Sequence, residues 1–285
     1  MAVIVNLSTI LTLRPDSTSI DKFAKICDSY AHGCLSGLRH ASSFFKNPVH
    51  QVNYAWVKLQ YRLKFNELIK PYEQGLITTP QFLQNLKSIF NFLDDVEELN
   101  AEDKQMLKEQ ANLFSTDPKL ALLETAWTET IGIEEEHAAR FPGLIEKNKD
   151  EPIYLISNTN ELYVRKIIAL LKQQNPSIKF FDPIDLSVKA ESDTTPIEIA
   201  KNVFLCLSYR YGKFKTEDQH PPTTMSLMKH LVTQQLRLPL EQVEVISQFP
   251  GDLAEASALQ ISDWNIHTDT DYFASISPRQ SMAAQ

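Results

Sequence analysis

The stretch that decides the fold is Ile153-Tyr-Leu-Ile-Ser-Asn-Thr-Asn-Glu-Leu162. Its first four residues are apolar, with β-branched and aromatic members, and have the length and composition of a buried strand. Four small polar residues follow, and Thr159 or Asn160 can cap a helix. The apolar residues of that helix recur at helical spacing and form one stripe: Val164, Ile167, Ile168 and Leu171. The stretch predicts a strand, a polar turn and a helix, with the turn at the sheet edge where ligands bind, although any α/β protein with a polar turn fits the same local pattern.

Composition predicts a soluble globular protein, since 43% of the 285 residues are apolar and 22% are charged. The chain is long enough for one large domain or two ordinary ones. The net charge of −8 argues against nonspecific binding to nucleic acid or to an anionic membrane. No apolar run is long enough to span a bilayer, and the first residues do not resemble a secretory signal. We therefore expect a cytoplasmic protein without direct membrane insertion.

Motifs for metals and nucleotides are missing from the sequence. The three cysteines, Cys27, Cys34 and Cys206, form no C-x-x-C pair, and their odd number favours reduced thiols over a disulfide framework. The seven histidines have no ligand spacing, and neither G-x-G-x-x-G nor G-x-x-x-x-G-K occurs. We expect no cofactor, with magnesium only if the protein is a phosphatase after all.

Strands and helices alternate along most of the chain, which predicts an α/β fold with parallel strand pairing. Short apolar runs predict strands at residues 2–5, 153–156, 178–181, 203–207 and 243–246, and helical stripes dominate from residue 17 to about 147. In one of these helices Thr79 is a plausible N-cap, with Pro80 at the first helical position. We expect a Rossmann-like core of residues 1–15 and 149–262 with an insertion at 182–201, an inserted all-helical cap of residues 16–148, and a polar C-terminal tail of residues 263–285.

The order of these elements resembles the haloacid-dehalogenase-like (HAD) hydrolases with a helical cap after the first strand. Three patches carry the resemblance: the Ser-Asn-Thr-Asn-Glu turn at 157–161, Tyr72-Glu-Gln-Gly-Leu-Ile-Thr-Thr-Pro-Gln-Phe-Leu83, and Ala126-Trp-Thr-Glu-Thr130. Most such proteins are magnesium-dependent phosphatases with a Rossmann-like core. The resemblance implies that Ser157 holds the phosphoryl group and that Lys215 offsets the charge on nucleophile and phosphate. Together with Asn158, these residues are expected to form a vestigial anion-binding site.

Several positions depart from the pattern of this family. The resemblance implies an attacking aspartate at position 6 and an acidic residue at position 8, where this chain has Asn6 and Ser8. An amide is a far weaker nucleophile than a carboxylate, and a serine hydroxyl is not an acid near neutral pH. Ser247 and Gln248 replace the acidic pair that binds magnesium, and Asp252 is the only matching carboxylate. These departures predict a pseudoenzyme without a working catalytic or metal site.

A non-catalytic scaffold or adaptor that binds other protein subunits is our leading hypothesis. One setting that fits is a bacterial multi-protein complex such as a secretion-system assembly, although no motif identifies it. The alternatives are a divergent phosphatase that uses Ser157, Lys215 and Asp252, and a protein that binds phosphate or a phosphometabolite without cleaving it. The cations Arg210, Lys213 and Lys215 lie beside Tyr209 and Tyr211, but such a loop is more often a solvated turn, and we expect no nucleic-acid partner.

Overall fold

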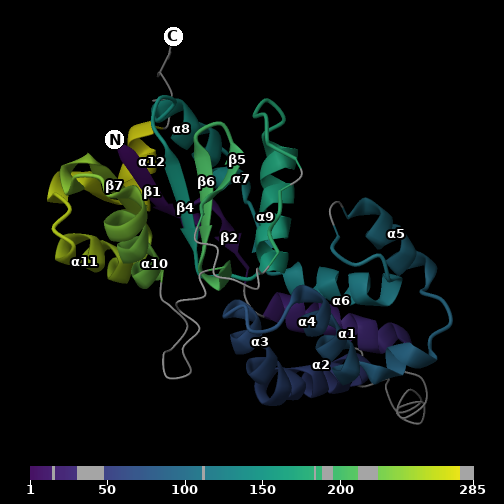
Figure 1. The fold of residues 1–285 in the computed structure, drawn as a ribbon. Coiled ribbons are helices and arrows are strands. Elements are labelled where there is room, and N and C mark those ends of the chain that lie inside the picture. The colour runs from purple at the N-terminus through teal and green to yellow at the C-terminus, as the bar shows by residue number, and fades with distance from the viewer. Residues whose placement is uncertain are drawn as a thin grey trace. The chain divides into compact units, whose positions relative to one another are not determined.

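The computed structural model describes residues 1–14, 17–30, 48–110, 113–182, 184–187, 195–210 and 224–276 (Figure 1). They belong to two units. The α/β unit comprises Met1–Thr12, Gly132–Asn160 and Leu170–Gln285, and the helical unit comprises Leu13–Ile131 and Glu161–Ala169. Helix α9 (Glu161–Gln174) contributes to both units.

The α/β unit is built on a six-stranded sheet with the order β5-β6-β4-β1-β7-β8 (Figure 1). All neighbouring strands from β6 to β8 run parallel, and this arrangement confirms the predicted Rossmann-like class. The strands are β1 (Ala2–Asn6), β4 (Ile153–Ser157), β5 (Ile197–Ala200), β6 (Val203–Leu207), β7 (Val243–Ser247) and β8 (Ile266–Thr268). A separate two-stranded sheet pairs β2 (Thr12–Leu13) with β3 (Ile131–Gly132).

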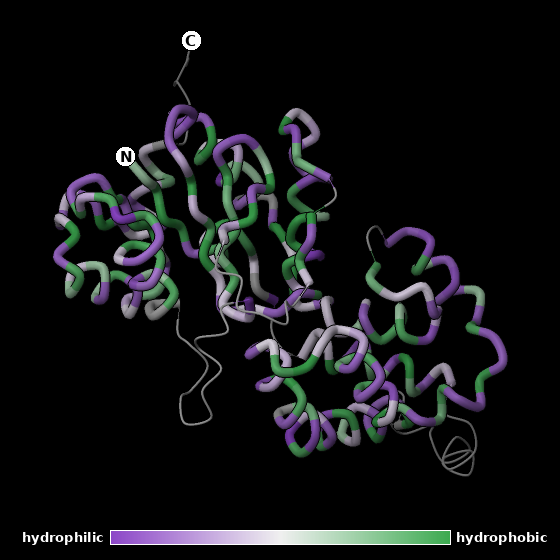
Figure 2. The backbone as a smooth tube through the Cα atoms, in the orientation of Figure 1, coloured by the Kyte–Doolittle hydropathy of each residue, from purple (hydrophilic) through white to green (hydrophobic). Residues whose placement is uncertain are grey.

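The central strands are apolar because they are covered on both faces. All five residues of β1 are buried, as expected for the middle of a parallel sheet, and these strands are largely hydrophobic along their length (Figure 2). Helices α10 (Thr224–His230) and α11 (Pro250–Ala258) and the π-helix η7 (Leu231–Leu236) pack onto the sheet through a core that includes Ile4, Val245 and Leu231. Helices α8 (Arg140–Lys147) and α12 (Asp269–Ile276) pack together, α12 contacts β7, and the short helix α7 (Glu135–Ala138) precedes α8.

The helical unit is held together by an aromatic core. Phe23 stacks on Phe90 with a centroid separation of 5.0 Å, and Phe82 stacks on Tyr72 at 4.2 Å. Such ring pairs add to the stabilisation from burial alone. The helices of this unit, besides the first part of α9, are α1 (Ser17–Tyr30), α2 (Pro48–Gln60), η3 (Tyr61–Phe65), α3 (Asn66–Glu73), α4 (Thr79–Ile89), η4 (Asn91–Asp95), α5 (Ala101–Glu109) and α6 (Pro118–Thr128).

Helix α4 begins one residue away from the predicted N-cap. Thr79 is the first residue of the helix and is fully buried, while Thr78 is the N-cap. The Gln81 side chain accepts a 2.8 Å hydrogen bond from the Thr78 backbone N–H, as in a capping box. Two consecutive threonines before a proline leave the sequence pattern ambiguous by one position.

The sheet differs from the sequence prediction at both edges. Residues 178–181 do not form a strand, since only a single bridge joins Phe180 to Ala200. The end of the expected 182–201 insertion is instead strand β5, which runs antiparallel to β6 because a two-residue connection is too short for a parallel crossover. The expected polar tail contributes β8 and α12 as far as Ile276. Edge elements are short and partly polar, so their hydrophobic pattern is weak.

None of the helices in the described ranges is both long enough and apolar enough to cross a bilayer.

Candidate functional site

The candidate site lies at the carboxyl ends of β1 and β7. Along the chain, β1 is followed in this sheet by β4, which lies on one side of β1. Strand β7 lies on the other side of β1 and is followed by β8, further out on that side. The strand order therefore reverses between β1 and β7, and open α/β sheets bind ligands at such a switch point. Asn6 ends β1 and Ser247 ends β7, so both side chains belong to this edge.

Asn6 uses both ends of its side-chain amide. Its Oδ1 accepts hydrogen bonds from the Ser8 backbone N–H at 3.1 Å and from the Ser8 hydroxyl at 2.6 Å. Its Nδ2 donates a 2.7 Å hydrogen bond to Oδ2 of Asp252. This orientation of the amide follows from its partners, because a carbonyl oxygen facing the Asp252 carboxylate would be repelled. Asn6 thereby caps the short 3-10 helix η1 (Leu7–Ile10) and joins it to α11.

Asp252 accepts a second hydrogen bond at the same oxygen. The Ser247 hydroxyl donates to Oδ2 of Asp252 at 2.6 Å and accepts from the Phe249 backbone N–H at 3.1 Å. Asp252 is 5% exposed and Ser247 is 1% exposed, so these bonds are shielded from water. Asp252 lies in the first turn of α11, where the helix dipole also stabilises a negative charge. The carboxylate is held by neutral donors and by the helix.

The residues of this site do not fit a magnesium ion. Magnesium requires oxygen ligands at about 2.0–2.1 Å in octahedral geometry, usually with one or two carboxylates. Here the Asn6 atom that faces Asp252 is an amide nitrogen that donates, and the Asn6 oxygen is occupied by Ser8. Across the part of the chain that the structure describes, no three His, Cys, Asp or Glu side chains are grouped as metal ligands.

The other predicted site residues are only partly brought together. Ser157 and Asn158 are half-buried at the end of β4, and Asn6 is in register with Ile156, so they belong to the same sheet edge as Asn6. Helix α9 begins at Glu161, directly after the buried Asn160. Gln248 is exposed, and Lys215 lies outside the described residues.

The basic loop considered for nucleic acid is described only at its start. Tyr209 is 1% exposed and Arg210 is 6% exposed, and the Tyr209 hydroxyl donates a 2.7 Å hydrogen bond to the Leu186 carbonyl oxygen. Both side chains therefore belong to the interior, where they do not present a surface to nucleic acid. Tyr211 and Lys213 lie outside the described residues.

Three residues that support the site were not found from the sequence. The Thr9 hydroxyl donates to the Asn6 carbonyl oxygen at 2.8 Å. The Arg140 guanidinium donates to the Thr9 carbonyl oxygen at 2.5 Å and to the Asp269 carboxylate at 3.0 Å. An arginine 131 positions away from Thr9 has no local sequence signal, and Asp269 falls in the expected tail. Together they fix the backbone that carries Asn6.

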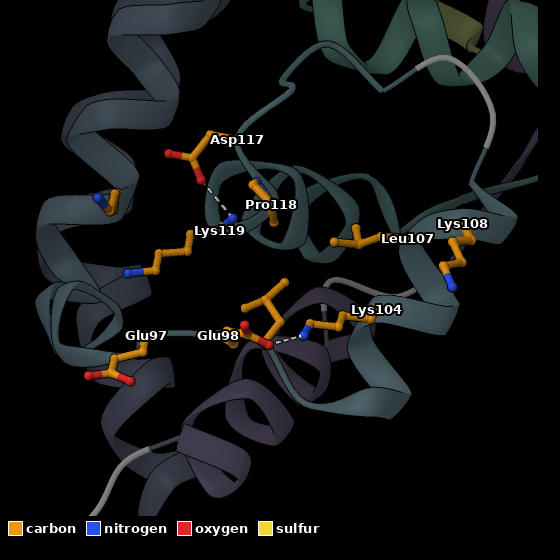
Figure 3. Close-up of a pocket in the computed structure, with 10 residues that line it drawn as sticks. Glu97, Glu98, Lys104, Leu107, Lys108, Asp117, Pro118 and Lys119 are labelled. Atoms are coloured by element: carbon orange, nitrogen blue, oxygen red, sulfur yellow. Dashed lines mark hydrogen bonds and ion pairs between the residues drawn. The ribbon is translucent and has the colours of Figure 1, made fainter.

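A cavity of about 640 Å³ lies in the helical unit, beside α5 and the start of α6 (Figure 3). Its charges are mixed: Lys104 forms an ion pair with Glu98, whereas Asp117 caps α6 by accepting from the Lys119 backbone N–H. None of the ten residues that line it is a serine, cysteine or histidine. They are Lys87, Glu97, Glu98, Leu99, Lys104, Leu107, Lys108, Asp117, Pro118 and Lys119. Its lining therefore lacks the hydroxyl or thiol nucleophile with an adjacent histidine that covalent hydrolases use.

A buried polar network ties the start of α9 to the helices of the same unit. The Thr79 hydroxyl donates to Oε2 of Glu161 at 2.6 Å and contacts the Tyr72 hydroxyl at 2.9 Å. Arg165 Nε and Nη2 both donate to the other oxygen of Glu161, at 3.0 and 2.8 Å. The Tyr72 hydroxyl accepts from the Leu162 backbone N–H. Glu161, the last residue of the conspicuous turn, therefore has a structural role in this unit.

No protein-family model matches the chain, and no curated protein sequence matches it. Among solved structures, a HAD family enzyme from Bacteroides thetaiotaomicron aligns with 94% of this chain and 92% of its own, at 14% identity and a TM-score of 0.48. A second structure of that enzyme, in complex with magnesium and inorganic phosphate, aligns over the same shares at 16% identity and a TM-score of 0.45. A predicted HAD-like family hydrolase from Porphyromonas gingivalis aligns with 94% of this chain and 88% of its own, at 14% identity and a TM-score of 0.42. Similarity at this level concerns the general course of the chain and says nothing about its activity.

Proposed function

We propose that this protein is a catalytically inactive α/β protein that works as a scaffold or adaptor by binding other proteins. The observation that carries the proposal is the 2.7 Å hydrogen bond from Asn6 Nδ2 to Asp252 Oδ2. The amide at position 6 satisfies a buried carboxylate, and a carboxylate at the same position would oppose it. The site therefore favours an uncharged donor at position 6, and asparagine there has no carboxylate oxygen to attack phosphorus.

The neighbours of Asn6 supply no substitute for the missing chemistry. Ser8 is the residue that the family resemblance aligns with the proton donor, and its hydroxyl donates to Asn6 instead. Ser247, aligned with a metal ligand, donates to Asp252. A nucleophilic serine needs an adjacent general base. In the described part of the chain, Asp252 is the carboxylate that bonds to Asn6 and Ser247, and its Oδ2 already accepts from both, which supports loss of phosphoryl transfer.

A binding role accounts for a chain that keeps its core without its catalytic groups. Both units have well-packed interiors, with the aromatic cluster in one and the fully buried β1 in the other. Such packing would not persist without selection for some function of the folded protein. Several large apolar side chains are nevertheless exposed, including Val52, Leu59, Leu63, Phe249 and Trp264, and exposed apolar groups that gather on one surface mark interaction sites.

Purification of the protein with its native partners, combined with a turnover assay, tests the proposal. We expect the protein to elute reproducibly in a larger assembly, for which a bacterial secretion-system complex is one setting. We expect no hydrolysis of an aryl phosphate in the presence of magnesium. A solitary monomer in native extracts would contradict the adaptor role. Turnover that is lost in Asp252→Asn would contradict the loss of catalysis. Calorimetry with inorganic phosphate separates the remaining alternative, anion binding without cleavage.

A further inference from the structure

The outer surface of α2 and η3 carries an exposed apolar stripe. The two helices follow one another without a break from Pro48 to Phe65. Val52, Leu59 and Leu63 are 43%, 51% and 58% exposed. They are seven and four positions apart, a spacing that places them on one side of a helix. We call Val52, Leu59 and Leu63 the outer stripe.

The outer stripe is not the side by which this segment joins its own core. Val57 and Phe65 are the fully buried apolar residues of the segment, and Phe65 packs edge-on against Phe23 at 5.5 Å. The buried Asn53 donates to the Asp28 carboxylate of α1 at 2.7 Å. A surface helix normally presents one apolar side to its core and polar groups to water. Here a second apolar stripe faces away from the packed side.

Positive charge flanks the outer stripe. Residues 48–65 contain no aspartate or glutamate, although the whole chain has 36 acidic and 28 basic residues and a net charge of −8. Lys58, Arg62 and Lys64 lie within or directly after the stripe, and all three are exposed. Arg62 is four positions after Lys58 and three after Leu59, so these side chains are neighbours on the helix surface.

The charge and the apolar residues together define the chemistry of a partner. Covering the three stripe residues would remove their exposed apolar surface from water, which favours binding. Acidic groups on the partner would complement the cations and suppress basic competitors. Basic helices with an apolar side also bind anionic membranes, but the net charge of the molecule opposes that.

We propose that the outer stripe binds an acidic amphipathic helix of a partner protein. Leucine-like residues of that helix would pack between Val52, Leu59 and Leu63, and its flanking glutamates or aspartates would pair with Lys58 and Arg62. This mode is the binding of a helix along an apolar surface, with anchors at three- and four-residue spacing. The inference rests on the proposed adaptor function and names the surface and the partner chemistry that it uses.

Photo-crosslinking in the cells that make the protein tests this proposal. Benzoylphenylalanine replaces Leu59 in the full-length chain, and the matched control places it at Leu76, a leucine of the same unit that is 54% exposed and outside the stripe. We expect at least tenfold more partner crosslinking from position 59 than from position 76. Mass spectrometry should place the crosslink in a partner segment that is net acidic and has apolar residues at helical spacing. Crosslinks to a basic segment, to lipid or to a second copy of this chain would each overturn the proposal.

Charge and apolar variants provide an independent readout. Lys58→Glu with Arg62→Glu, and separately Leu59→Glu with Leu63→Glu, should each lower recovery of the native complex at least tenfold, while Leu76→Glu should not. Circular dichroism melting confirms that the variants fold, as expected for exposed positions. If the complex survives both double variants and position 59 gives no crosslink, the outer stripe is not the binding surface, and the proposed adaptor function is unaffected by this result. If the unmodified chain has no partner at all, the adaptor function itself fails.

Discussion

Asn6 donates through Nδ2 to Asp252 Oδ2 at 2.7 Å, and this bond joins the end of the first strand to a helix 246 positions later. Asn6→Ala and Asp252→Ala should each lower the free energy of unfolding by about 2–3 kcal/mol, because each leaves a buried polar group with fewer partners. The double variant should show a coupling energy of about 1–2 kcal/mol. Urea denaturation of the natural chain, the two single variants and the double variant measures this coupling energy. Additive losses would mean that the hydrogen bond contributes little.

Asn6→Asp should destabilise the protein most at neutral pH. The substitution places two carboxylates within hydrogen-bonding distance, so that one of them must bind a proton or the pair must separate. We expect a loss of about 1–3 kcal/mol near neutral pH that shrinks in mild acid, since the folded variant then binds the shared proton. Thermal melting between mild acid and neutral pH measures this loss of stability. Asn6→Ala is the control and should not show the same pH dependence.

The combined variant Asn6→Asp with Ser247→Asp should gain affinity for magnesium. It places three carboxylates at the carboxyl ends of β1 and β7, where the natural chain has one. A hard dication stabilises such a cluster and relieves its repulsion. We expect added magnesium to raise the melting temperature of this variant and to leave that of the natural chain unchanged. An equal rise in both proteins would show that the natural site already binds the ion.

Glu73→Gln should stabilise the protein at neutral and higher pH. Burial raises the pKa of Glu73 from 4.5 to about 7, and the residue ends α3, where the helix dipole also disfavours a negative charge. The folded state therefore holds this proton more tightly than the unfolded state, and stability falls as the pH rises from about 4.5 to 7. Glutamine at this position removes that decline, so the free energy of unfolding should be about 1–3 kcal/mol higher than that of the natural chain at pH values above about 7. Denaturation at several pH values measures the difference; parallel pH profiles would contradict the assignment.

Thr79→Val should destabilise the helical unit by about 1–3 kcal/mol, because it removes a fully buried hydroxyl that bonds Glu161 at 2.6 Å and contacts Tyr72. Thr79→Ser keeps the hydroxyl and loses only a methyl group, so its cost should be smaller. Chemical denaturation compares the two variants. A larger loss from serine than from valine would show that packing, and not the network, holds this position.

The central strands could be predicted from the sequence for a clear physical reason. Strands buried on both faces are largely apolar, so β1, β4, β6 and β7 were evident, although Glu244 interrupts the run in β7. Asn6, Ser247 and Asp252 were singled out through the family resemblance, which assigns roles to positions at and after the ends of the first and last of these runs. The edge strands β5 and β8 were not predicted, because their residues are few and partly exposed.

The contacts within the site could not be predicted, because they join distant parts of the chain. The sequence indicated that Asn6 lacks a negative charge, but it did not indicate that the amide donates to Asp252. Arg140 and Asp269 support the Asn6 backbone from positions with no local pattern. The exposure of the outer stripe on α2 and η3 could likewise be recognised only in the structure, because apolar residues at helical spacing normally indicate the buried side of a helix.

Turnover of an aryl phosphate by the purified natural chain, with magnesium present, tests the central claim most directly. Because Asn6 presents an amide and Ser247 a hydroxyl to the buried carboxylate of Asp252, we expect no hydrolysis above the uncatalysed rate. The parallel Lys215→Ala and Asp252→Asn variants should then be indistinguishable from the natural chain. Magnesium-dependent turnover that either variant abolishes would contradict the account.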